Sequence, residues 1–308
     1  MLSERGRGLA FSLLGAVCSA AYLFPYKRAA QFAPADVLAF ALLVVAAVLS
    51  LGAAWVERRP VPVAPVAPVA PVAAEPPVPA VPPRLLWAPA LLLAVLTITG
   101  NYCGAQAVAR LDPAINSVLL RTEVVFVGVL GALLLREPVT RRLAVGGLTA
   151  LAGLCVMRWP LSLEAASSGV PWALGAAASF GSMQVITRRV IHRILPAGVN
   201  MLRLWIAVGL LGCVPHLLER ALAAGPRFWI SVAGAACFGP FAGRLCIMYS
   251  LRGLRAAESA LLLLLAPVFA FTIGFVGWGT VPSGRELAGG ALMLIGIALP
   301  QLGALAWL

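Results

Sequence analysis

Apolar and polar positions are arranged in long blocks along the chain. Apolar runs close to the length of about 20 residues that crosses a bilayer as an α-helix are separated by polar connections, most of them short. The ten runs lie at residues 8–26, 37–56, 87–108, 114–135, 141–158, 170–187, 200–218, 229–250, 257–279 and 286–305. This pattern predicts an all-α integral membrane protein with ten transmembrane helices, in which neighbouring helices are antiparallel.

The first run has a second interpretation. Its sequence GRGLAFSLLGAVCSAAY combines basic flanks, an apolar stretch and small residues, which also describes a secretory signal peptide or a lipoprotein signal around Cys18. The run continues to Tyr26 and another apolar run follows soon after it. We therefore expect a retained first helix.

Residues 57–86 interrupt the succession of helices. This segment holds ten of the 24 prolines, many of them in the repeat PVAPVAPVAPVA. Such a composition cannot form a packed core and favours extended polyproline II. We expect a solvated cytoplasmic tether between the second and third helices, with a strip that docks a partner as the alternative.

Composition agrees with a membrane protein. The chain is 61% hydrophobic and 11% charged, and its mean hydropathy is +0.97. A net charge of +12 suggests nucleic-acid binding in a soluble protein, but here the basic residues cluster at the ends of apolar runs, where they meet anionic lipid headgroups. No polar segment shows a basic stripe with interleaved aromatics. We expect contacts with membrane lipid and no nucleic-acid partner.

Cysteine and histidine give no indication of a metal site. The six cysteines all fall within apolar runs and form no CxxC pair, so we interpret them as small packing residues. With only His192 and His216 as histidines, we predict no metal and no cofactor.

Charge in the loops predicts the orientation. The loops on the same side of the membrane as the N-terminus carry more Lys and Arg than the loops on the other side, although Lys27 and Arg28 oppose this bias. By the positive-inside rule both termini are cytoplasmic.

The two halves of the chain share an order of features. A shift of 143 residues places Leu111 on Leu254 and aligns two stretches without a gap. In each copy a long apolar run and a short polar turn precede a Gly-x5-Gly helix, GLTALAG or GALMLIG. With five runs in each half, an odd number, the second half is inverted relative to the first. Inverted repeats are typical of alternating-access transporters.

Three features carry a resemblance to a known family. They are the turn Arg136-Glu137-Pro138 before a Gly-x5-Gly helix, the sequence Pro267-Val268-Phe269, and Arg203 seven residues after Pro196. The chain resembles the ten-helix drug/metabolite transporter superfamily, in its bacterial EamA-like branch. The resemblance implies a repeat over residues 1–159, a second over residues 160–308, and a location in the bacterial inner membrane.

The sequence departs from this family pattern at three places. Ala41 stands at the position equivalent to Arg203, and Thr280 at the position equivalent to Glu137. Glu123-Val124 stands opposite Ala266-Pro267. These departures leave the implied fold intact, but the family pattern does not identify the substrate of this chain.

The resemblance implies a central cavity lined chiefly by the first, third, fourth, sixth, eighth and ninth helices. The 143-residue shift aligns Asn101 with Arg244 and Gln106 with Tyr249, as expected of a shared cavity wall. Arg244 suits a carboxylate or phosphate, or alternatively reaches the cytoplasmic headgroups. The predicted substrate-binding residues are Arg244, Asn101, Tyr102, Gln106, Gln184 and Tyr249. For Tyr102 and Gln184, helix–helix contacts are an equal alternative.

Glu123 lies near mid-bilayer on a short side chain. A carboxylate at that depth can carry a proton, or it can pair with an arginine and hold helices together. Arg121, about 200° round a regular helix, is not expected to share its face, so Arg244 is the expected partner.

Other residues have expected structural roles. We expect Arg203 to anchor an interface or a loop carbonyl. Glu137 and Pro138 are expected to start the next helix, and Pro267 is also expected to be structural.

We therefore expect a secondary active transporter that exports a small metabolite, amino acid or drug, with protons as the coupling ion. No GxxxxGK[ST] loop for ATP is present. One alternative is an integral-membrane enzyme, but its only acid–base cluster, Arg136-Glu137, lacks a histidine, serine or second carboxylate, so we predict no enzyme. A non-transporting scaffold or sensor is another. The sequence is also compatible with a homodimer.

Overall fold

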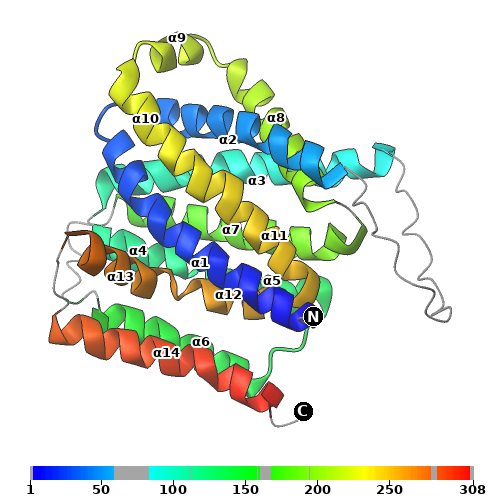
Figure 1. Ribbon diagram of the computed structural model, residues 1–308, viewed down its shortest axis with the longest axis vertical. Helices are drawn as coiled ribbons and strands as arrows, with labels where there is room; N and C mark the ends of the chain where they lie inside the picture. The colour runs from blue at the N-terminus through cyan, green and yellow to red at the C-terminus, as the bar shows by residue number, and fades with distance from the viewer. Residues whose placement is uncertain are drawn as a thin grey trace, which may run out of the picture.

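The computed structural model describes residues 3–58, 83–111, 113–157, 159, 168–193, 195–278 and 283–305, and these form helices and turns without a strand (Figure 1). Most of the Pro-rich segment 57–86, and Thr280, lie outside the described residues. The helical elements of the first half are α1 (Glu4–Ala29), α2 (Ala35–Arg58), α3 (Pro83–Arg110), α4 (Pro113–Arg121), α5 (Glu123–Leu135) and α6 (Arg141–Met157). Those of the second half are α7 (Val170–Val190), η2 (Ile191–Arg193), α8 (Pro196–Gly212), α9 (Leu217–Leu222), α10 (Gly225–Ala236), η3 (Cys237–Gly243), α11 (Arg244–Gly253), α12 (Ala256–Leu263), α13 (Ala266–Trp278) and α14 (Gly284–Leu305).

Length and hydropathy make this a multi-pass membrane protein. Within the described residues, five helical segments are long and apolar enough to cross a bilayer, and two shorter apolar helices accompany them. The five are Glu4–Ala29, Ala35–Glu57, Trp87–Arg110, Val118–Leu135 and Gly225–Gly253. The all-α membrane prediction is confirmed, whereas the number of ten spans stays a prediction.

Two predicted runs are each divided into two helices. The run 114–135 breaks at Thr122, between α4 and α5, and the run 257–279 breaks at Leu264 and Leu265, between α12 and α13. The 143-residue shift places Thr122 on Leu265, so the two breaks are equivalent in the two halves.

Local hydrogen bonding explains the first break. The backbone N–H and the hydroxyl of Thr122 both donate to the carbonyl of Leu119, at 3.1 and 2.6 Å. This tight turn replaces the regular bond to the fourth preceding residue. The same i to i−3 bonding occurs at Leu264 and Leu265.

A third irregularity lies in the run 229–250. The seven-residue π-helical segment η3 separates α10 from α11 and contains Pro240. Proline has no N–H to donate to the preceding turn, and π turns of this kind are frequent at functional sites. Apolar periodicity carries no signal for it, because η3 keeps the apolar character of its neighbours.

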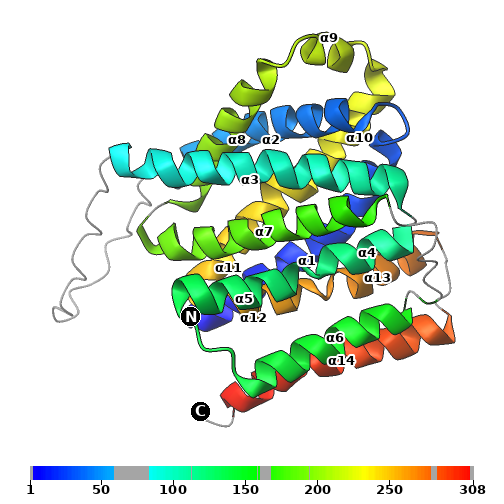
Figure 2. The ribbon, with the colours of Figure 1, turned by 180° about the vertical axis from the view of Figure 1, so that it is seen from behind.

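Helix packing shows the relation between the two halves. The most extensive inter-half pairs are α1 with α11, α3 with α7, α2 with α8, and α6 with α14. Exchanging the halves turns the first pair into the second and leaves each of the other two pairs unchanged. The first residue of α1 and the end of α14 lie at the same end of the bundle (Figures 1 and 2).

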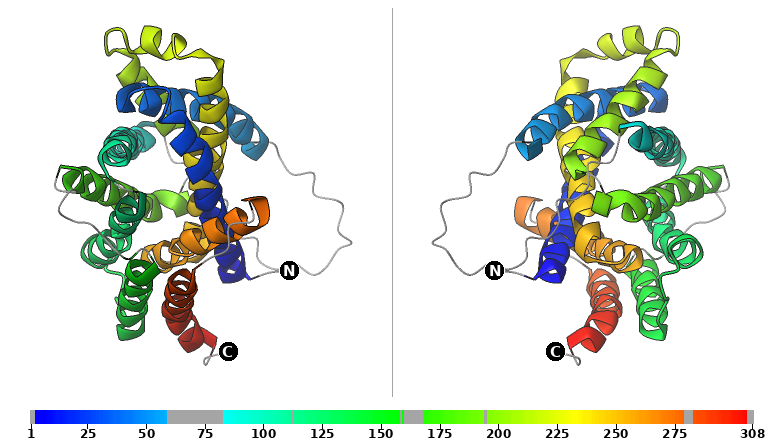
Figure 3. Two further views of the ribbon diagram at one scale, coloured as in Figure 1. Left: turned by 90° about the vertical axis from the view of Figure 1, so that its left-hand side faces the viewer. Right: turned by 90° about the vertical axis from the view of Figure 1, so that its right-hand side faces the viewer.

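The helices α6 and α14 form an antiparallel pair at one edge of the molecule, visible when the bundle is seen along the helices (Figure 3). Glycines bring their backbones together. A Cβ on Gly146 would lie 2.4 Å from the carbonyl oxygen of Gly296, and one on Gly153 would lie 2.6 Å from that of Gly289. Small residues permit such close approach of helices in membranes.

Candidate functional site

A cavity of about 180 Å³ lies between the two halves. From the first half, α1, α3, α4 and α5 contribute to its wall, and from the second half α7, α8, η3, α11 and α12 do so. Its polar lining residues include Ser19, Tyr22, Tyr26, Asn101, Asn116, Arg121, Glu123, Arg203 and Arg244. The helices implied by the family resemblance line this cavity, and α8 adds one wall through Arg203.

The cavity reaches toward the end of the bundle opposite the termini. Tyr26 near the end of α1, Val108 near the end of α3 and Asn116 near the start of α4 all line it. Toward the other end the lining extends only as far as residues such as Ile247, six residues before the end of α11, and Leu263, seven residues after the start of α12. The cavity therefore extends closer to the end opposite the termini than to the terminal end.

Glu123 begins α5 directly after the break at Thr122. Its Oε1 accepts a hydrogen bond of 2.5 Å from Nε2 of Gln184 on α7. Arg244 and Arg121 line the same cavity as Glu123. No ion pair within 4.0 Å joins Glu123 to either arginine in the described structure.

The expectation that Arg121 and Glu123 face different directions is wrong. Both residues line the cavity, because α4 ends at Arg121 and α5 begins at Glu123. The separation of about 200° holds only for an unbroken helix. The tight turn at Thr122 brings two oppositely charged side chains to one wall.

Arg244 and Arg121 present guanidinium groups to the cavity without an acceptor. The guanidinium carbon of Arg244 lies 5.5 Å from the ring centre of Phe180, a cation–π contact. Neither arginine has a hydrogen bond or ion pair to another part of the described chain. A guanidinium carries five N–H donors, so both groups are available to a ligand.

Arg203 lies in a different environment, 1% exposed. Its Nε and Nη2 donate to Oδ1 of Asn200, at 3.0 and 2.6 Å. Its Nη1 donates to Oγ1 of Thr97 at 2.6 Å, and its Nη2 also donates to the carbonyl oxygen of Pro240 at 3.2 Å. Thr97 and Pro240 are equivalent under the 143-residue shift, so Arg203 joins corresponding points of the two halves.

Two asparagines complete the polar wall. Nδ2 of Asn101 donates to the carbonyl of Thr97 at 2.8 Å. Asn116 is 7% exposed and its Oδ1 is buried without a hydrogen-bond donor. An unpaired buried acceptor costs roughly 1–3 kcal/mol, which a ligand with a donor would relieve.

Four of the expected binding residues, Tyr102, Gln106, Gln184 and Tyr249, are not among the residues that line the cavity. Tyr102 packs edge-to-face on Trp172, with ring centres 5.8 Å apart. Gln106 accepts a hydrogen bond from Arg110 one turn along α3.

Tyr249 is directed to the terminal end of the bundle, where its hydroxyl donates to Oε1 of Glu57 at 2.7 Å. The alignment of Gln106 with Tyr249 thus marks equivalent positions in the chain without placing them on one wall. Gln184 contacts the site only through its hydrogen bond to Glu123.

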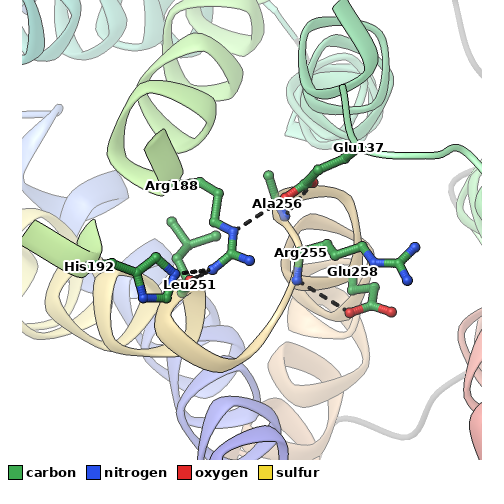
Figure 4. Close-up of polar contacts among 7 residues, drawn as sticks. All are labelled: Glu137, Arg188, His192, Leu251, Arg255, Ala256 and Glu258. Atoms are coloured by element: carbon green, nitrogen blue, oxygen red, sulfur yellow. Dashed lines mark hydrogen bonds and ion pairs between the residues drawn. The ribbon is translucent and has the colours of Figure 1, made fainter. Parts of the chain in front are cut away.

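Glu137 joins the two halves at that terminal end (Figure 4). Its Oε1 lies 3.2 Å from Nε of Arg188, and its Oε2 accepts a hydrogen bond of 3.1 Å from the N–H of Ala256, the first residue of α12. Arg188 also donates to the carbonyl of Leu251 at 2.5 Å. The carboxylate is at a helix N-terminus as expected, but the helix is α12 of the other half.

The two prolines occupy different positions relative to their helices. Pro138 is exposed in the connection 136–140, three residues before α6 begins, so it does not start that helix. The connection first turns through Arg136, whose φ is +54°, and this directs Glu137 toward α12. Pro267 is buried as the second residue of α13, where a missing N–H is tolerated.

Sequence reasoning missed part of this arrangement. Glu57 accepts hydrogen bonds from the N–H groups of Ala197 and Gly198, at 2.8 and 3.3 Å, at the start of α8. Glu57 belongs to the Pro-rich segment 57–86, whose composition predicts a solvated tether and no contact with another helix. Asn116 could have been found as a polar residue inside an apolar run, whereas Arg121 was set aside by the helical-wheel argument.

Comparison with known proteins addresses the whole chain. The model of the EamA-like transporter family matches residues 6–159 and again residues 167–300. A solved structure described as "Crystal structure of protein" superposes with a TM-score of 0.69 at 18% identity, over 97% of this chain and 98% of that chain. At this identity the likeness supports the fold alone. A search of curated proteins finds no significant match.

Proposed function

The chain belongs to the EamA-like transporter family, and from this premise we propose that it is a secondary active transporter that moves a small metabolite by alternating access. The family makes it a membrane transporter of the drug/metabolite type. The observation that carries the mechanism is a cavity with walls from both halves that contains Arg121, Glu123 and Arg244. Inverted-repeat transporters hold their substrates at this interface.

The size of the cavity favours a small substrate. Its volume of about 180 Å³ is below the roughly 300–1,000 Å³ typical of pockets for drug-sized ligands. A metabolite with few heavy atoms fits this volume better than a multi-ring drug does.

Glu123 is the proposed carrier of the coupling proton. It is the only carboxylate among the described lining residues, and its short side chain cannot reach a membrane surface. Protonation would remove its charge from the vicinity of Arg121 and Arg244. The charge of the site would then differ between the two states, which is a physical means of coupling proton movement to substrate binding.

The contacts at the terminal end are the proposed inner gate. Glu137 links α12 to Arg188, and Glu57 links Tyr249 to the start of α8. With the termini in the cytoplasm, these contacts hold the inner side together while the cavity faces outward. Their release would let the halves rock about the broken helices and accept cytoplasmic substrate for export.

Reconstitution tests this function. We expect proteoliposomes with an internal pH indicator to show a pH change when a panel of small metabolites is applied. In Glu123→Gln, which keeps the hydrogen-bonding shape of the side chain, coupled proton movement should be lost. The matched control Glu219→Gln removes an exposed carboxylate on α9 and should transport normally. Normal pH-driven transport by Glu123→Gln would refute the assignment of the proton carrier.

A further inference from the structure

Unpaired guanidinium groups in the cavity point to the class of its substrate. We propose that the site takes a small organic anion, held at its carboxylate or phosphate by Arg121 and Arg244, and that the same substrate carries a hydrogen-bond donor for Asn116. This inference rests on the proposed transport function, because it identifies what the central cavity binds.

The three cavity arginines differ in whether their N–H donors are already bonded within the protein. Every nitrogen of Arg203 already donates to Asn200, Thr97 or Pro240, so this residue is a positioning group within the protein. Arg121 and Arg244 have no acceptor in the described part of the chain, although both line the same cavity. The ring of Phe180 attracts the charge of Arg244 but accepts none of its in-plane N–H donors.

Charge balance selects an anion. Three guanidinium groups face a single carboxylate across the described lining, and that carboxylate accepts a hydrogen bond from Gln184. The wall therefore has an excess of positive charge even when Glu123 is ionised. A cationic substrate would meet like charges there, whereas a carboxylate or phosphate matches the planar donor array of arginine in a bidentate contact.

Asn116 adds a second requirement. Its Oδ1 is buried, unpartnered and part of a residue that lines the cavity. A donor on the ligand, such as a hydroxyl or an ammonium group, would satisfy this acceptor. The site thus fits a small hydroxy acid, amino acid or phosphorylated polyol better than a simple anion.

Binding to the purified protein in detergent tests the proposal without requiring transport. The probes are lactate and glycerol 3-phosphate, with the neutral analogues lactamide and glycerol and the cation ethanolamine. We expect either anion to raise the unfolding temperature in a saturable way and the other probes to have little effect. Equal stabilisation by neutral or cationic probes, or none by the anions, would overturn the proposal.

Variants assign the binding groups. Arg121→Gln and Arg244→Gln should each weaken anion binding by about ten- to 100-fold, as expected for a hydrogen bond to a charged group. The control Arg142→Gln removes an exposed arginine of α6 and should bind as the parent does. Arg121→Lys and Arg244→Lys keep the charge without the planar donors and should give intermediate affinity, which separates binding from folding. Anion affinity unchanged in both Gln variants would refute the assignment.

Binding and flux can fail separately. Anions that bind through Arg121 and Arg244 without any flux would contradict the transporter function while supporting the anion site. Flux of a neutral or cationic compound in a protein that does not bind the anionic probes would support the transporter and overturn the anion site.

Discussion

Arg203 is a buried charge whose partners are all neutral. Four hydrogen bonds to Asn200, Thr97 and Pro240 replace the water that the guanidinium has lost. Its contacts in α3 and η3 connect the first half to the second at the level of the cavity. The sequence predicted that Arg203 anchors an interface or a loop carbonyl, but not which carbonyl it would reach.

We expect Arg203→Lys to destabilise the protein although the charge is kept. A lysine ammonium cannot bond Asn200, Thr97 and Pro240 in the same fixed geometry, and an unsatisfied buried acceptor costs roughly 1–3 kcal/mol. The unfolding temperature in detergent measures this loss. Arg142→Lys, an exposed change of the same kind, should leave that temperature unchanged. An equal effect of the two substitutions would contradict the anchoring role.

His192 gives the protein a predicted sensitivity to acid. Burial lowers the pKa of its imidazole, and the positive charges of Arg188 and Arg252 lower this pKa further. In the unfolded chain the pKa is about 6.5, so below this value the unfolded state binds more protons. Stability is therefore full above about pH 6.5 and falls as the pH drops toward the folded pKa.

His192→Gln should flatten this dependence, because glutamine can still accept from Arg188, which donates to Nε2 across 2.7 Å, and does not titrate. The test compares unfolding temperatures between about pH 7.5 and pH 5.5. His216→Gln changes an exposed histidine at the end of the bundle opposite the termini. This variant should keep the parental dependence of unfolding temperature on pH. A parental slope in His192→Gln would show that other groups set the acid response.

Candidate residues were more predictable than their contacts. A charged side chain inside an apolar run is visible in any sequence, so Glu123 and Arg244 were found. The grouping of Arg121 with Glu123 was not predictable, because it depends on a break at Thr122 that leaves the apolar pattern unchanged. Contacts between distant segments, such as Glu137 with Ala256, depend on packing that one sequence does not specify.

The pairing of α6 with α14 depends on glycine at particular positions. We expect Gly153→Ala to destabilise the protein by roughly 1–3 kcal/mol, because the new Cβ would meet backbone atoms of α14 within 2.6 Å. Gly147→Ala is the control on the same helix, since a Cβ there meets nothing within 4 Å. It should be neutral or slightly stabilising through helix propensity. Thermal unfolding in detergent distinguishes the two, and similar values would indicate that these helices separate easily.

Most helices were predicted with ends near their observed ones, because apolar runs of bilayer length leave few alternatives. The exceptions have physical reasons. Thr122 competes for a backbone carbonyl through its hydroxyl, and Pro240 removes a backbone donor within η3. The short helix α9 lies in the connection between α8 and α10, where the apolar pattern had suggested a longer seventh run.

Orientation concerns the molecule as a whole and is still a prediction. On a cysteine-free background, Ser3→Cys should react with a membrane-impermeant maleimide only after the cells are permeabilised. A protein that retains Cys213 alone should react in intact cells, because this exposed thiol lies at the opposite end, after α8. The reverse pattern would invert the topology, and with it the assignment of the inner gate.

A single carboxylate among cavity arginines has an electrical consequence. If an anion leaves the cell while a proton bound to Glu123 enters, both movements carry positive charge inward. For a monoanion, each cycle transfers two elementary charges, worth together about 4.6 kcal/mol per 100 mV of interior-negative potential. Voltage alone would then concentrate the anion outside, and a collapsed pH gradient would slow such a pump without stopping it.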